Sequence, residues 1–142
     1  MIELTPTQAQ IVLAILAQMS LAAIVLIMLP VPRILAIRAK QVKRDDHGRP
    51  IFPKWATQVS DCFSNQFQMP VLFYALCLLI LFLRFESPNI VMFAWAFVAL
   101  RVIHALIFVT TNFVPLRFTF FILSSLAFLS MLLQVVRRIL GV

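Results

Sequence analysis

Four long apolar runs, separated by short polar segments, constrain this chain more than any other feature of its sequence. The runs cover residues 8–30, 62–83, 89–111 and 116–136. Each holds about 20 residues or slightly more, which as a helix crosses a hydrocarbon core of ~30 Å. Hydrophobic residues make up 63% of the chain, well above the share in a typical soluble domain. Because backbone polar groups in lipid must bond to one another, the runs predict helices. We therefore expect an all-α membrane protein, a four-transmembrane-helix bundle that forms a single domain over residues 1–142.

Basic residues are concentrated in the connection between the first two runs, at about residues 33–59. By the positive-inside rule this loop lies in the cytoplasm, and both termini lie on the opposite side. Arg137 and Arg138 are the exception, because they fall on that opposite side. The loop suits contact with anionic lipid head groups; nucleic acid is not an expected partner, because the cations are not organised with stacking aromatic residues. The loop has two acidic residues, Asp45 and Asp46, and seven basic ones, Arg33, Arg38, Lys40, Lys43, Arg44, Arg49 and Lys54.

The middle of this loop reads Asp-Asp-His-Gly-Arg-Pro over residues 45–50, a series of turn-forming residues. Asp45, Asp46 and His47 are of types that bind metals, but nothing else in the loop completes a coordination set. We expect a turn here, and neither a metal nor a haem in the protein.

The second apolar run begins with a polar stripe. Asp61, Asn65 and Gln68 are spaced i, i+4, i+7, which places them on one face of a helix. Pro70 follows, and it is expected to kink the helix because it cannot donate a backbone hydrogen bond. Polar groups in lipid need partners inside the protein. Two interpretations stay open: the stripe is the wall of a cavity, or it bonds packed helices to one another.

The third run carries a second polar stripe, Arg101, His104 and Phe108, with Thr111 one turn further. Arg101 lies near the middle of its run, too deep to reach water easily, and therefore needs a partner. Helix rise places this stripe at the same depth as Gln68. The two stripes are thus expected to face each other. A bound anion, Gln68 and an acid from another subunit are the alternatives for the partner of Arg101.

The order of these motifs resembles the MAPEG family, the membrane-associated proteins in eicosanoid and glutathione metabolism. The motifs are a basic first loop, Asn65-x-x-Gln68-x-Pro70, Arg101-x-x-His104 and Thr111-Asn112-x-x-Pro115-x-Arg117. The resemblance covers nearly the whole chain and indicates a divergent, bacterial-type member of the inner membrane. It implies a four-helix subunit that assembles as a homotrimer. In the family's transferases, it further implies, glutathione lies between adjacent subunits in the cytoplasmic half, held by arginines and by an Asn and a Glu of the second helix.

The carry-over of family residues has gaps. Asn65 matches the family asparagine, whereas Gln68 stands where the family has glutamate. Asp61 falls where the glutathione-binding enzymes carry an arginine, and an acid there repels the carboxylates of glutathione. His104 and Phe108 occupy positions where those enzymes tend to have tyrosines, and Phe108 has no hydroxyl to donate. Arg101 matches a family arginine, and Arg117 lies close to the position of the thiol-activating one.

Two functions follow as expectations. The first is a glutathione- or other thiol-dependent transferase or peroxidase that acts on a lipophilic substrate. In that case the resemblance assigns catalytic roles to Arg101 and Arg117, and cosubstrate binding to Asn65, Gln68, His104 and Arg38. The second is a noncatalytic membrane subunit, whose polar residues are structural and whose partners are lipid or other membrane proteins. A transporter is less favoured, because the chain shows neither repeats nor pairs of broken helices.

Overall fold

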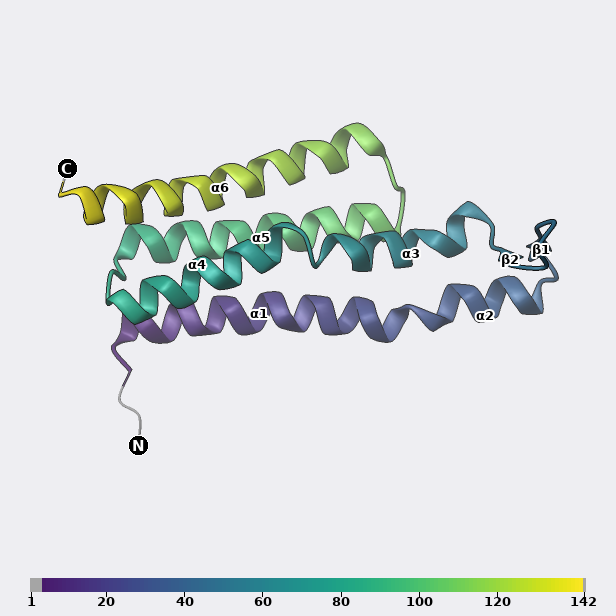
Figure 1. The fold of residues 1–142 in the computed structure, drawn as a ribbon, viewed down its shortest axis with the longest axis horizontal. Coiled ribbons are helices and arrows are strands. Elements are labelled where there is room, and N and C mark those ends of the chain that lie inside the picture. The colour runs from purple at the N-terminus through teal and green to yellow at the C-terminus, as the bar shows by residue number, and fades with distance from the viewer. Residues whose placement is uncertain (1–3, 142) are drawn as a thin grey trace.

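In a computed structural model, which describes residues 4–141, the chain is a bundle of long helices with a small hairpin at one end (Figure 1). The helices combine into four spans that are long and apolar enough to cross a membrane: α1 with α2, α3 with α4, α5, and α6. These spans contain 33, 30, 22 and 27 residues. The elements are α1 (Pro6–Met28), α2 (Pro30–Arg38), β1 (Lys43–Arg44), β2 (Pro50–Ile51), α3 (Lys54–Asn65), α4 (Met69–Leu83), α5 (Pro88–Val109) and α6 (Val114–Leu140). The all-α, four-span prediction is confirmed.

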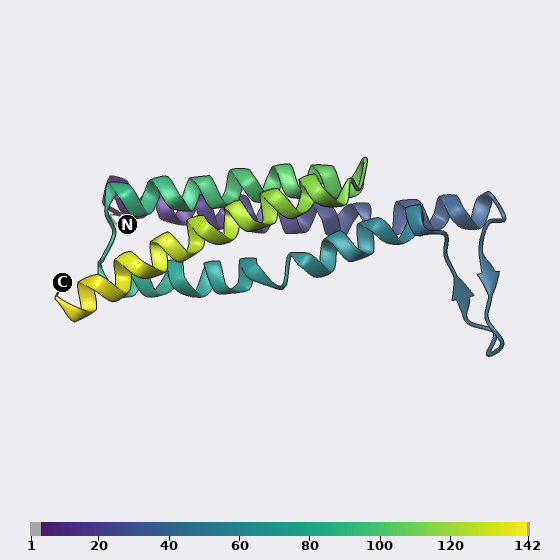
Figure 2. The ribbon, with the colours of Figure 1, turned by 90° about the horizontal axis from the view of Figure 1, so that it is seen from above.

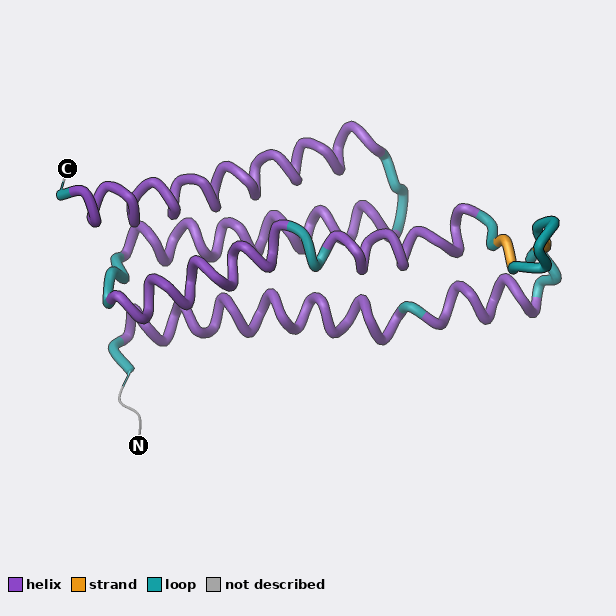
Figure 3. The backbone as a smooth tube through the Cα atoms, viewed as in Figure 1, coloured by secondary structure: helices purple, strands orange, loops and turns teal. Residues whose placement is uncertain are grey.

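Two of the spans are interrupted (Figure 3), and a proline follows each interruption. Pro30 is the first residue of α2, and Pro70 is the second residue of α4. The first turn of a helix tolerates a proline, because proline lacks a backbone N–H and the first N–H groups of a helix have no intrahelical partner. The helix expected over 62–83 therefore begins earlier, at Lys54, and stops at Asn65 before it resumes at Met69. We call residues 66–68 the break.

The connection expected over 33–59 is largely ordered. Its two ends are helical, within α2 and α3, and its middle is an antiparallel hairpin that pairs Lys43 with Ile51 and Arg44 with Pro50. The Asp45 carboxylate accepts hydrogen bonds from the backbone N–H groups of His47 and Arg49, at 2.9 and 2.7 Å, which stabilises the predicted turn. Figure 2 shows the hairpin extending beyond the helices. We call this the hairpin end of the bundle, and the opposite end, where both termini lie, the termini end.

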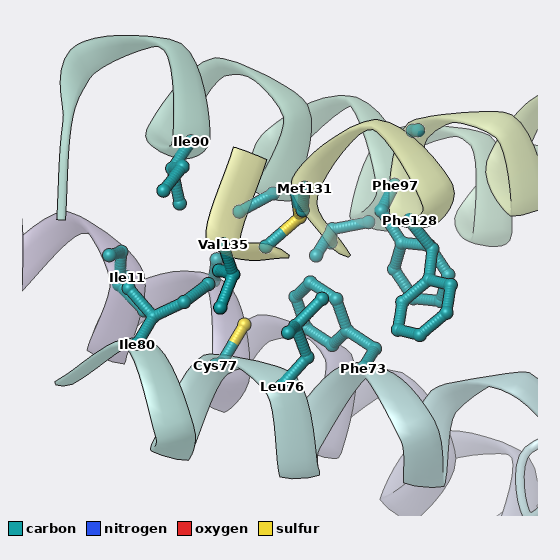
Figure 4. Close-up of a cluster of buried hydrophobic side chains, with 14 residues drawn as sticks. Ile11, Phe73, Leu76, Cys77, Ile80, Ile90, Phe97, Phe128, Met131 and Val135 are labelled. Atoms are coloured by element: carbon teal, nitrogen blue, oxygen red, sulfur yellow. The ribbon is translucent and has the colours of Figure 1, made fainter. Parts of the chain in front are cut away.

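The termini half of the bundle has the larger apolar core. Side chains from α1, α4, α5 and α6 form it (Figure 4), and the rings of Phe73 and Phe97 stack there with centroids 4.4 Å apart. In lipid, close packing rather than the hydrophobic effect holds helices together. Helix α5 is central, since it packs against α6, α1 and α3. It therefore carries its polar residues into the interior of the bundle. The buried members are Ile11, Ala14, Phe73, Leu76, Cys77, Ile80, Ile90, Ala94, Phe97, Val98, Ala127, Phe128, Met131 and Val135.

Candidate functional site

The break between α3 and α4 supplies a hydrogen-bond acceptor to Arg101. At the end of α3, the N–H groups of Gln66 and Phe67 bond to the carbonyls of Phe63 and Ser64, which tightens the last turn. The carbonyl of Asn65 instead accepts a hydrogen bond from Nη2 of Arg101, at 2.9 Å. Arginine is well suited to cap a helix C-terminus, where the helix dipole is negative.

Arg101 is fully buried, and only part of its guanidinium is bonded. Its exposed fraction is 0%, and its Nε and Nη1 atoms have no hydrogen-bond partner within residues 4–141. The partner of Arg101 in this chain is thus a backbone carbonyl, which none of the sequence-based alternatives included. Two unpaired nitrogen atoms on a buried cation leave capacity for a further acceptor.

One turn along α5, His104 contacts the start of α6. Its Nδ1 lies 2.9 Å from the backbone carbonyl oxygen of Arg117. A carbonyl oxygen can only accept, so Nδ1 carries the proton and Nε2 presents a lone pair. Nε2 is buried and has no partner among the described residues. The ring is held by edge and tilted contacts with Phe108 and Phe121, at centroid distances of 5.9 and 6.1 Å.

Two contacts hold the guanidinium of Arg117 in the first turns of α6. Its Nη1 donates to Oδ1 of Asn112 at 2.6 Å, and its central carbon lies 4.0 Å from the centre of the Phe108 ring. The second contact is a cation–π interaction. Phe108, which has no hydroxyl, therefore acts as a platform that positions a cation. Arg117 remains partly exposed.

These residues surround one pocket of about 190 Å³. Four of the six predicted site residues line it, so polar side chains from the second and third runs lie at one level of the bundle. Arg101 is not among the lining residues, but it bonds the carbonyl of one of them. We call this the polar pocket; its lining residues are Asn65, Gln68, His104, Val114, Arg117, Phe118 and Phe121.

Three sequence-based placements differ from the structure. Asp61, Asn65 and Gln68 do not form one continuous helical face, because α3 ends at Asn65 and Gln68 lies in the break. Thr111 lies beyond the end of α5 and is exposed. Arg38 ends α2 as an exposed residue and does not line the polar pocket. Because Arg38 is far along the chain from the second run, the sequence did not show whether it lies near the other predicted site residues.

The sequence analysis missed a buried amide pair. Nε2 of Gln18, on α1, donates to Oε1 of Gln66 in the break, at 3.0 Å, and the two residues are 0% and 1% exposed. The remaining amide atoms of both side chains, Oε1 of Gln18 and Nε2 of Gln66, have no partner within the described chain. The available signal was an amide in the middle of the first apolar run. Such an amide needs a partner in lipid.

The sequence matches a known family. The model of the MAPEG family matches residues 11–137 of the 142-residue chain. No curated protein matches the chain, and no solved structure matches it. The matched region contains most of each of the four spans, the break and the residues that line the polar pocket. This chain belongs to the MAPEG family.

Proposed function

We propose that this MAPEG membrane protein binds glutathione or another anionic thiol at the polar pocket and transfers it to a lipophilic substrate. The observation that carries the proposal is the convergence of Asn65, Gln68, His104 and Arg117 on one pocket. Two amides can orient a cosubstrate by hydrogen bonds, and a guanidinium can stabilise an anionic sulfur.

The chemistry requires a thiolate nucleophile. The thiol loses its proton to solvent or to Nε2 of His104, and the sulfur anion is stabilised by the guanidinium of Arg117. The sulfur then attacks an electrophilic carbon of the apolar substrate; a C–S bond forms, and the leaving group departs with its electron pair. Phe118 and Phe121 give the pocket an apolar side for that substrate.

The size of the polar pocket supports a shared site. At about 190 Å³ it is smaller than the roughly 300–1,000 Å³ of pockets that enclose small-molecule ligands. One chain therefore supplies the thiol end of the site, and the remainder of the cosubstrate lies against a neighbouring copy. This supports assembly as a homotrimer with the polar pocket at the subunit boundary. The cluster of seven cations near the hairpin end supports a cytoplasmic location for that end.

The test is glutathione-dependent conjugation of an apolar aryl halide by the full chain in lipid vesicles, together with the ultraviolet absorbance of the bound thiolate. Arg117→Gln is expected to lower turnover by about 10²-fold and to abolish the thiolate signal, as loss of one preorganised donor does elsewhere. Arg49→Gln, which removes an equal charge from the exposed hairpin turn, is the matched control and is expected to leave both readouts unchanged. Equal losses in the two variants would contradict the proposal.

A noncatalytic membrane subunit is the second candidate, and the contacts of Arg101 favour it. Arg101 caps α3, and the buried Gln18–Gln66 pair joins α1 to the break. Both contacts hold segments of the chain together, which is a structural role. In this case no thiolate signal forms in the unmodified protein. Arg101→Leu then destabilises the helix bundle, because the contact of Arg101 with the carbonyl of Asn65 is lost.

A further inference from the structure

The termini end of the bundle has a second pocket, and the two basic residues that lie opposite the basic loop are beside it. Arg137 and Arg138 lie in the last turn of α6 at the end opposite the basic hairpin. Both views of the ribbon bring the end of α6 close to the turn between α4 and α5 (Figures 1 and 2). A pocket of about 480 Å³ opens between these segments. We call it the arginine pocket; Phe85, Ser87, Ile90, Gln134, Arg137 and Arg138 line it.

Both arginines are exposed, and one of them, Arg138, is positioned by a contact with another segment. The guanidinium carbon of Arg138 lies 5.1 Å from the centre of the Phe85 ring, a cation–π contact between α6 and the turn. Phe85 is itself fixed, because its backbone N–H donates to the carbonyl of Ile80 at 3.0 Å. A stacked guanidinium keeps its N–H groups at the ring's edge available for a planar or tetrahedral oxyanion.

Other polar groups of the arginine pocket add donors. The Ser87 hydroxyl oxygen accepts from the backbone N–H of Ile90 at 3.3 Å, which leaves its own hydrogen available to donate. One amide hydrogen of Gln134 is directed to the carbonyl of Ser130 at 3.3 Å, and the second is available. The pocket also lies at the N-terminus of α5, where the helix dipole is positive.

A simpler role for the two arginines is to complement the dipole of α6, whose C-terminal end is negative. That role does not require the same guanidinium to stack on a residue of another segment, nor a cavity with hydroxyl and amide donors beside it. The combination has the features of an anion site. The pocket lies at the ends of two spanning helices, α5 and α6, and the ends of such helices are expected near the polar head groups of a bilayer. Phe85 and Ile90 give it an apolar side.

We propose that the arginine pocket binds the phosphate group of an anionic phospholipid on the termini side of the membrane. The phosphate oxygens accept hydrogen bonds from Arg137, Arg138 and Ser87, and the glycerol backbone lies against Phe85 and Ile90. This site is independent of the polar pocket, which lies in the hairpin half of the bundle.

The experiment is native mass spectrometry of the detergent-purified full chain titrated with phosphatidylglycerol, and in parallel with phosphatidylcholine. Arg137→Gln and Arg138→Gln are each expected to weaken phosphatidylglycerol binding on the order of fivefold, and the double variant about twenty-five-fold. Arg138→Lys keeps the charge but loses the planar guanidinium, so its affinity is expected to lie between those of Arg138→Gln and the unmodified chain.

Arg84→Gln is the matched control, because Arg84 is an exposed arginine at the same end of the bundle that does not line the arginine pocket. It is expected to change the affinity by less than about twofold. Equal weakening by Arg84→Gln and Arg137→Gln would show general attraction to surface charge and would overturn the proposal. Unchanged binding in the double variant, with its helical circular dichroism intact, would overturn it as well.

The same titration with glycerol phosphate separates the two sources of a phosphate group. Weak binding of the soluble compound, with tight binding of the lipid, supports the lipid as the ligand. Equally tight binding of glycerol phosphate, lost in the double variant, would overturn the lipid assignment in favour of a soluble phosphate ester.

Discussion

The two halves of the bundle are built differently. The termini half contains a cluster of fourteen buried hydrophobic residues drawn from four helices, whereas the corresponding cluster in the hairpin half has five. From the middle of the bundle toward the hairpin end, buried Gln18, Gln66, Arg101 and His104 replace apolar side chains. Stability is therefore expected to reside in the termini half, and the capacity to bind a polar ligand in the hairpin half. Four predictions test this division, each given as a change in the free energy of unfolding or of binding.

The largest effect is expected in the apolar half. Phe73→Ala removes a fully buried ring that stacks on Phe97, and such truncations cost about 3–5 kcal/mol of unfolding free energy. Unfolding of the purified protein in mixed detergent micelles, followed by circular dichroism, measures the loss. Phe82→Ala, on the same helix but 84% exposed, is the control and should be close to neutral. Similar losses in both variants would mean that the stacked cluster does not hold this half together.

The next effect concerns the break. Arg101→Leu removes the hydrogen bond to the carbonyl of Asn65 and is expected to cost about 1–3 kcal/mol, because a buried acceptor is left unpaired. Hydrogen exchange of the backbone amides at residues 66–68 should accelerate, while exchange in the core of α4 stays slow. Arg101→Lys retains a donor and should restore part of the protection. Unaltered exchange at the break in Arg101→Leu would show that the cap does not hold it.

A smaller gain is expected at the mouth of the polar pocket. Gln68→Glu restores the charge that the family motif carries, and the new carboxylate can pair with the amine of glutathione. Gln68 is exposed, so the gain is that of a solvent-accessible ion pair, about 0.2–1 kcal/mol, or up to roughly fivefold in affinity. Calorimetric titration measures it. A lower affinity in the variant would argue that the amine does not lie near residue 68.

The smallest change in the free energy of unfolding is expected from the buried amide pair. Gln18→Leu removes the hydrogen bond to Gln66, and interhelical hydrogen bonds in membrane proteins contribute about 0.6 kcal/mol on average. The same micelle unfolding assay should show a change of about that size. A loss comparable to that of Phe73→Ala would contradict the division between the two halves, because the hairpin half would then carry much of the stability.

The sequence was sufficient for the features set by hydropathy and by single residues. Apolar runs of spanning length predicted the four spans, and Pro70 predicted an interruption of the second one. The face shared by Arg101, His104 and Phe108 followed from helical periodicity, and all three side chains are buried on α5.

The specific partner of each polar side chain across a helix interface could not be predicted. The break frees the carbonyl of Asn65, and only the packing of α5 against α3 brings Arg101 to it. Likewise, the pairing of Gln18 with Gln66 requires α1 to lie beside the break. The cation–π role of Phe108 was hidden because its partner, Arg117, comes from the next helix. In each case the missing information is a partner across a helix interface, which periodicity within one helix does not contain.

The measurement that tests the central claim most directly is calorimetric titration of glutathione into the detergent-purified protein, with oligomeric mass determined on the same sample. Saturable binding to an oligomer is predicted, weakened about tenfold or more in Arg117→Gln at unchanged mass, because Arg117 lines the polar pocket. An oligomer that shows no saturable heat, or one that binds glutathione equally well with and without Arg117, would contradict the assignment of the polar pocket as a thiol site.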